Sequence, residues 1–229
     1  MYAKILIGLY LIVSVNNCLA QDISSEQEIE SQNFQKLFPV NINFATFDID
    51  EGNVEINAHN ENFAKILYTP HFKECVIKID VIDSQLCIVN NKKEHGCKCD
   101  YKIYLPQNVE VITNLGAGTI NVHDLESKLQ LNLGAVKVGI FNTAGNIDLN
   151  MGTGSIKYNP ARSSDIQILN INYGSAELDC IFPKDTIVKS MPKNNFMIKV
   201  DSAVNFSDKN YNYEIKGSMG VGLVKLSYE

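Results

Sequence analysis

Between Val111 and Leu178 apolar and polar residues alternate, and the alternation breaks at one fixed place in each of four repeats. Each break carries a similar short phrase rich in asparagine, glycine and other small residues. The four copies are Asn114–Ile120, Asn132–Val138, Asn150–Ile156 and Asn170–Ala176, with their asparagines 18, 18 and 20 residues apart. A fixed period of this size predicts a stacked repeat rather than a single irregular sheet.

The residues around each phrase alternate with a period of two, which is typical of a half-buried strand. The apolar positions that lead into the first three copies are Val109, Val111, Leu129, Leu131, Leu133, Ile147, Leu149 and Met151. The alternation resumes after each phrase. Each repeat is therefore predicted to be a strand, a glycine corner, a second strand and a polar return.

The corners are predicted from glycines that recur at one place in the period. Gly116, Gly134 and Gly152 occupy this place, Asn172 takes it in the fourth copy, and Gly220 takes it in a later copy at Met219–Val224. Glycine and asparagine are the residues that enter positive φ at least cost. We therefore predict that these five residues form structural corners in a backbone conformation with positive φ.

The pattern predicts an all-β, single-domain parallel β-solenoid (β-helix-like) with coils of 18 to 20 residues. Side chains such as Leu131, Leu133, Val138 and Ile156 would fill its interior, so a ligand would bind on the outer surface. One column of the repeat contains only asparagines, which form either a hydrogen-bonded ladder or a row of solvated turn residues. These are Asn114, Asn132, Asn150 and Asn170.

Residues 1–20 have the features of a signal peptide. Lys4 gives a positive start, an apolar run follows from Ile5 to Val15, and Cys18–Ala20 provides a small-x-small cleavage site. The run is too short to span a bilayer, so no transmembrane segment is expected. A lipoprotein acylated at Cys18 is the alternative. Either interpretation predicts an exported protein that is periplasmic, secreted or on the cell surface.

After the signal we predict a polar leader or N-terminal cap at 21–40, either helical or disordered, and a β-solenoid adhesin-like domain at 41–229. The first part of this domain has irregular strands, expected at 65–68, 76–82, 86–89 and 101–105. From Ile181 to Lys216 the repeat lapses, which indicates two longer coils or a protruding hairpin. Because loops that interrupt a regular scaffold often carry function, we expect recognition to involve this segment.

Five cysteines follow the signal, and export makes disulfides the default for them. Cys87 and the Cys97/Cys99 pair flank a polar turn at 90–96, so we predict a bridge across a hairpin there, with Cys75 taking the other member of the pair. Cys180 would remain unpaired. The alternative is a zinc or copper site made of His95, Cys97 and Cys99, with or without Cys87. We predict disulfides, no metal and no other cofactor.

The chain is acidic, with 20 Lys and Arg against 26 Asp and Glu. Removal of the signal, with its single Lys4, leaves 19 basic and 26 acidic residues and a net charge of −7. This balance argues against nucleic acid as a partner.

Three features resemble a known family: a Gly52-x-Val54-x-Ile56 opening, a strand that closes on Ile103–Pro106, and then serial Gly-x-Gly-x-Ile coils. The chain from Asn41 to Tyr228 is similar to the putative-adhesin domain family of bacterial secreted and surface proteins, a β-solenoid class of largely unknown function. The resemblance implies a non-enzymatic module whose rigid outer surface binds a protein, glycan or envelope component.

Catalytic motifs are absent from the sequence, including the nucleophile elbow, the zinc-protease helix and the phosphate-binding loop. The alternative to a binding module is a glycan-active enzyme that uses carboxylates on its outer face. The column two places before each asparagine reads Ile112, Gln130, Asp148 and Ile168, so Asp148 is its single acid. A non-enzymatic protein is therefore expected.

Overall fold

The computed structural model describes residues 33–39, 41–72, 75–91, 97–189, 197–200 and 203–229. The predicted signal peptide, including Cys18, lies outside these residues. The described part is all-β, with one large, mostly parallel sheet and no helix, so it contains no helix that could cross a membrane. Its strands are β1 (Phe34–Phe38), β2 (Phe44–His59), β3 (Ala64–Pro70), β4 (Val76–Ile82), β5 (Gln85–Asn91), β6 (Cys99–Pro106), β7 (Glu110–His123), β8 (Leu129–Thr143), β9 (Ile147–Pro160), β10 (Gln167–Phe182), β11 (Ile187–Val188), β12 (Met197–Val200), β13 (Asn205–Phe206) and β14 (Tyr213–Tyr228).

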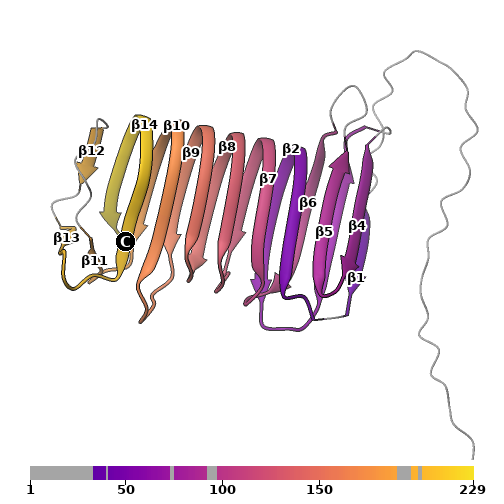
Figure 1. The fold of residues 1–229 in the computed structure, drawn as a ribbon, viewed down its shortest axis with the longest axis horizontal. Coiled ribbons are helices and arrows are strands. Elements are labelled where there is room, and N and C mark those ends of the chain that lie inside the picture. The colour runs from indigo at the N-terminus through magenta and orange to yellow at the C-terminus, as the bar shows by residue number, and fades with distance from the viewer. Residues whose placement is uncertain (1–32, 40, 73–74, 92–96, 190–196, 201–202) are drawn as a thin grey trace, which may run out of the picture.

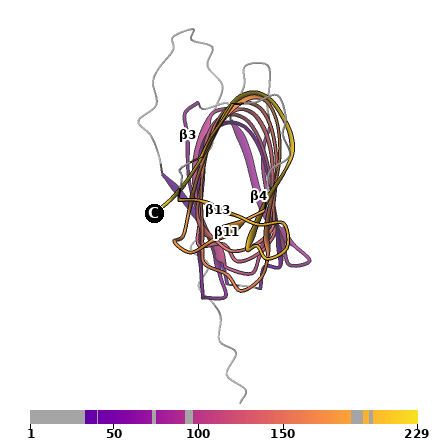
Figure 2. The ribbon, with the colours of Figure 1, turned by 90° about the vertical axis from the view of Figure 1, so that its left-hand side faces the viewer.

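Six long strands form the body of the molecule and pair in parallel in the order β2, β7, β8, β9, β10 and β14. Each has 14 to 16 residues and folds over midway, so that it has a first arm before the bend and a second arm after it (Figure 1). Seen along the stack, the ribbons follow one elongated outline (Figure 2). The sheet is not closed on itself, because its strand order ends at β1 and β13.

The core lies between the two arms, because alternate side chains of both arms point inward. In β8 the buried residues include Leu131 and Leu133 in the first arm and Val138 in the second, at 0%, 8% and 4% exposure. Ile156 in β9 is 1% exposed. The predicted interior residues are therefore confirmed.

In β2, β7 and β9 the bend contains a glycine with positive φ, which lies two residues after the place of the predicted corners, whereas β8 and β10 have Val136 and Ala176 there. Gly52, Gly118 and Gly154 have φ of 152°, 129° and 150° and share one column of the sheet with Val136. A Cβ on Gly118 would lie 1.9 Å from the carbonyl oxygen of Gly52. This column combines an unusual φ with close backbone contact.

None of the four predicted corner glycines has positive φ in the described structure, so the prediction of positive φ was wrong for Gly116, Gly134, Gly152 and Gly220. They are instead required by close approach of neighbouring strands. A Cβ on Gly134 would lie 2.2 Å from the carbonyl oxygen of Gly116, and one on Gly220 would lie 2.1 Å from that of Gly174.

Asn172 is not a corner, because it pairs in register with Asn150 rather than with Gly152. Gly174 takes the glycine position in β10, where an added Cβ would lie 2.8 Å from the carbonyl oxygen of Gly152. The longer return between Pro160 and Gln167 absorbs the extra residues and shifts the apparent repeat.

The N-terminal end differs from the stack. Strand β5 pairs with the first arm of β2 and strand β6 with its second arm, while β3, β4 and β1 add antiparallel strands outside them. Phe34–Phe38 form strand β1, so the helical and disordered alternatives for the leader are both wrong over these residues. Lys36 Nζ, from this strand, donates a hydrogen bond to the carbonyl of Ile79 at 2.7 Å, which joins β1 to β4.

At the other end, β14 pairs with β10 through most of its length and restores the repeat, with Ser175 opposite Val221. Between β10 and β14 the described residues form only three short strands, of which β11 and β12 pair in parallel with β14, and β13 pairs in parallel with β11. Residues 190–196 and 201–202 of this segment lie outside the described part of the chain.

Candidate functional site: an asparagine-lined groove

A column of asparagines crosses the first arms of the stack and forms a hydrogen-bonded ladder. Nδ2 of Asn132 donates to Oδ1 of Asn114 at 3.0 Å, Nδ2 of Asn150 to Oδ1 of Asn132 at 3.1 Å, and Nδ2 of Asn172 to Oδ1 of Asn150 at 3.0 Å. The ladder interpretation is therefore correct, with Asn172 and not Asn170 as its fourth member. Each amide donates toward the N-terminal end, so the amide dipoles are aligned.

The amide ladder is one wall of a shallow groove of about 740 Å³. The glycines Gly116, Gly134 and Gly152 line the same groove two residues further along each strand. Because these positions have no side chain, the surface beside the ladder is open to a ligand. An amide has two donor hydrogens and two acceptor lone pairs, so each middle asparagine keeps one of each after its ladder bonds.

The ends of the groove are residues that the sequence analysis missed. Asp48 pairs in register with Asn114 at one end, and Ser218 pairs with Asn172 at the other, where its backbone N–H donates to Oδ1 of Asn172 at 3.0 Å. A signal for both was present in the sequence. Asp48 and Ser218 stand four residues before Gly52 and Gly222, just as Asn114 stands four residues before Gly118.

Asp148, the residue named for the enzymatic alternative, lies outside the groove lining in the neighbouring outer column. Its Oδ2 is 3.4 Å from Lys128 Nζ, and its Oδ1 accepts from Nδ2 of Asn170 at 3.1 Å. In the structure Asn170, not Ile168, continues this column beside Asp148. Glycosidases of the two-carboxylate type need a second acid nearby, and Gln130 and Asn170 on either side of Asp148 are not acids.

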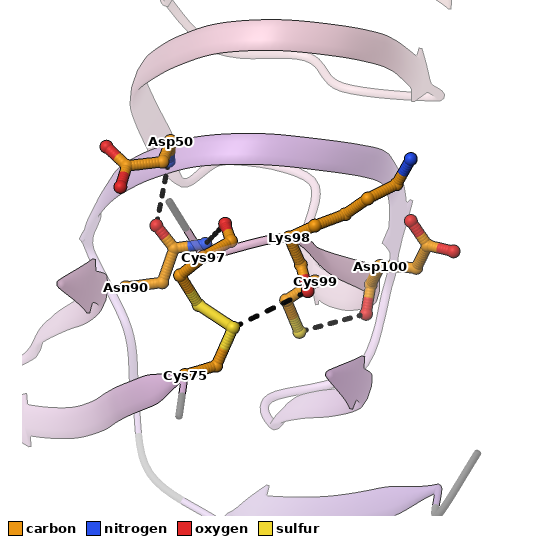
Figure 3. Close-up of a disulfide and its surroundings, with 7 residues drawn as sticks. All are labelled: Asp50, Cys75, Asn90, Cys97, Lys98, Cys99 and Asp100. Atoms are coloured by element: carbon orange, nitrogen blue, oxygen red, sulfur yellow. Dashed lines mark hydrogen bonds between the residues drawn. A yellow bond between two sulfur atoms is a disulfide. The ribbon is translucent and has the colours of Figure 1, made fainter. Parts of the chain in front are cut away.

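A disulfide between Cys75 and Cys97 lies at the N-terminal end of the groove (Figure 3). The prediction that Cys75 pairs with a member of the Cys97/Cys99 pair is confirmed. The prediction that Cys87 pairs with the other member was wrong, and Cys87, Cys99 and Cys180 are free. The predicted hairpin does not exist, because β5 and β6 run parallel to different arms of β2.

Buried Asn90 connects this disulfide to the groove. Its Oδ1 accepts from the backbone N–H of Asp50 at 2.7 Å, and its Nδ2 donates to the carbonyl of Cys97 at 3.3 Å (Figure 3). Asp50 also lines the groove. The disulfide and Asn90 together fix the bend of β2.

The metal alternative loses Cys97 as a thiolate ligand, because its sulfur is in the disulfide. His95 lies outside the described residues, and the described part of the chain holds no cluster of three or more potential metal ligands. Burial raises the pKa of the Cys99 thiol to about 11, so this thiol is protonated at neutral pH. Burial also raises the pKa of Cys180. Neither buried thiol is prepared for nucleophilic chemistry.

No protein-family model matches the chain, and no curated protein matches its sequence. The chain is similar in structure to a "putative cell adhesion protein" from Clostridium sporogenes, with 15% identity and a TM-score of 0.47, over 87% of this chain and 100% of that one. It is also similar to a "putative adhesin" from Parabacteroides distasonis, with 11% identity and a TM-score of 0.37, over 85% and 98% of the two chains.

A third similar structure is a "putative lipid binding protein" from Parabacteroides distasonis, with 11% identity and a TM-score of 0.35, over 83% of this chain and 96% of that one. At these values the similarities carry no argument about function, and they do not show family membership.

Proposed function

We propose that the protein is an exported, non-enzymatic binding module of adhesin-like character, in which a β-solenoid presents the asparagine-lined groove to an extended neutral polymer. The observation that carries the proposal is the amide ladder beside a column of glycines. The disulfide between Cys75 and Cys97 supports export, because such bonds persist in oxidising compartments. The proposed domain spans 41–229, after a signal peptide at 1–20 and a leader whose end forms β1.

The chemistry of the groove favours a ligand rich in hydroxyl groups. Apart from Asp48 and Asp50 at one end, the groove is lined by neutral amides, glycines, apolar residues, one tyrosine and one serine. A charged ligand group placed along this neutral part would lose hydration without gaining a counter-charge. Hydroxyl groups can donate hydrogen bonds to the unused amide oxygens' lone pairs and accept them from the unused amide N–H groups. A glycan strand has such groups along its whole length.

The spacing of the groove favours a polymer that lies across the strands. Neighbouring strands of a sheet are about 4.8 Å apart, so the asparagines repeat at about this interval. The side chains on one face of an extended peptide are about 6.7 Å apart, so their spacing does not match that of the asparagines. We therefore favour a glycan over a peptide.

The test compares two variants of one strand. Asn172→Leu removes an amide from the groove, and Asn170→Leu removes a similar amide rung from the neighbouring column outside it. Binding is measured with four neutral hexasaccharides: cellohexaose, laminarihexaose, maltohexaose and N-acetylated chitohexaose. We expect at least one to bind at the groove, at least tenfold more weakly in Asn172→Leu than in wild type, and unchanged in Asn170→Leu. Equal affinity in the two variants would contradict the proposal.

A further inference from the structure

A second cleft of about 600 Å³ lies on the second arms, beyond the bend from the groove. It crosses four neighbouring strands, β3, β6, β2 and β7, and we call it the second-arm cleft. Six of the residues that line it are Asn53, Glu55, Leu67, Asp100, Lys102 and Thr119. Since the buried faces of the two arms point toward each other, the groove and this cleft open on opposite sides of the stack.

The polar side chains of the second-arm cleft are held by a network that joins the strands. Asp100 Oδ1 accepts from the backbone N–H and from Nδ2 of Asn53, at 2.8 and 2.9 Å. Asp100 Oδ2 lies 3.0 Å from Nε2 of His71, and Thr119 Oγ1 donates to Oδ1 of Asn53 at 2.6 Å. The side chains are therefore positioned before any ligand arrives, which lowers the entropic cost of binding.

The charged side chains of the cleft already have polar partners. Lys102 Nζ lies 3.2 Å from Oε1 of Glu55, and Asp100 faces His71. Partial burial pushes the pKa of Glu55 upward, but hydrogen bonds with Asn57 and Lys102 outweigh it and leave the pKa below its ordinary value. Glu55 is therefore ionised at neutral pH. A charged ligand would have to break an existing pair, whereas a neutral ligand can use the remaining lone pairs and N–H groups.

Leu67 supplies an apolar surface among these polar groups, since it is half-buried and lines the cleft. A few positioned polar groups beside an apolar wall are typical of sites for small organic ligands. A sugar ring matches this combination, because it has hydroxyl groups at its edge and a C–H face.

We propose that the second-arm cleft is a second binding site, for a neutral saccharide. The cleft would bind its sugar whether or not the groove binds a glycan. If the proposed function also holds, one molecule carries two saccharide sites on opposite sides and can bridge two glycan strands.

The experiment is calorimetric titration of the full chain with the same four neutral hexasaccharides. Leu67→Gln removes the apolar wall, and Lys65→Gln, which places the same side chain two residues away on β3 and outside the cleft lining, is the control. We expect two sites in wild type and in Lys65→Gln, one site in Leu67→Gln, one in Asn172→Leu, and none in the double variant. Melting temperatures check that each variant is folded. If Leu67→Gln does not fold, it is replaced by Asn121→Leu, which changes another residue that lines the cleft.

Each outcome decides a different point. If a folded Leu67→Gln variant keeps every site of the wild type, the second-arm cleft is not a binding site. If Leu67→Gln loses a site and Asn172→Leu loses none, the cleft proposal holds and the groove proposal fails. If none of the four hexasaccharides binds the wild type, both proposals fail.

Discussion

The stack from β7 to β10 and the N-terminal end, where β1, β3, β4, β5 and β6 surround the first long strand β2, keep long strands folded over a narrow core by different means. The stack repeats two columns, one of glycines and one of asparagines, so each strand is stabilised in the same way as its neighbour. The N-terminal end uses single contacts that do not recur: one disulfide, the buried Asn90 and the bond from Lys36 to strand β4. Repetition therefore makes a region predictable from sequence, whereas the structure of an end depends on particular residues.

The largest expected effect comes from breaking the bend of the stack. Gly118→Val places a branched side chain at a φ of 129° with its Cβ 1.9 Å from a backbone oxygen, and should destabilise the protein by about 2–5 kcal/mol. Gly134→Val has the close contact without the unusual φ and should cost about 1–3 kcal/mol. Urea denaturation measures both. Ala117→Val is the control, and equal losses for Gly118→Val and Ala117→Val would contradict the role given to the bend.

The N-terminal end is tested by removing its covalent bond. Cys97→Ser opens a disulfide whose cysteines are 22 residues apart, and should lower the free energy of unfolding by about 3 kcal/mol. Cys87→Ser, at a free cysteine, should change it by less than about 1 kcal/mol. If peptide mapping of the oxidised protein finds Cys87 in the bond instead, the pairing described for this end is incorrect.

The amide ladder is tested by replacing one side-chain amide with a carboxylate. Asn150→Asp replaces the donor to Asn132 by a second acceptor, and should cost about 1–2 kcal/mol at pH 7. The cost should shrink below about pH 4, because a protonated carboxyl group can donate the lost hydrogen bond. Thermal denaturation at the two pH values, relative to wild type, gives the answer. A loss that does not depend on pH would show that the ladder bond is not its cause.

The smallest effect is expected at the outermost strand. Lys36→Met keeps the aliphatic stem but removes the hydrogen bond to Ile79, and should cost about 0.5–1 kcal/mol. Hydrogen exchange should then increase in β1 and β4 and stay unchanged in β7 to β10. Faster exchange throughout the stack would mean that the end and the stack unfold as one unit.

The sequence predicted the stack well because the burial of each residue there follows from its place in a regular, repeated pattern. Alternation places Leu131 and Val138 inward without knowledge of any partner strand. The spacing of the repeats also predicted the 18-residue register from Asn114 to Asn150, because the return loops between these copies have the same length.

The sequence failed where a non-local choice decides the structure. The longer return after Pro160 concealed that Asn172, not Asn170, continues the ladder. Cys87 and Cys97 are near in sequence, but their segments pair with different arms of β2, so spacing along the chain wrongly predicted a bond from Cys87 to the Cys97/Cys99 pair, while it correctly placed Cys75 with a member of that pair. The second-arm cleft joins residues from four strands, and no local motif marks it.

The most direct test of the groove is nuclear magnetic resonance of protein labelled with ¹⁵N at asparagine, titrated with the four neutral hexasaccharides. The side-chain amides of Asn114, Asn132, Asn150 and Asn172 report on the ladder, and that of Asn170 serves as an internal control. We predict that at least one hexasaccharide shifts the resonances of the four ladder amides together and leaves that of Asn170 in place. Saturable binding that leaves the ladder amides unshifted, or no binding by any of the four, would contradict the account.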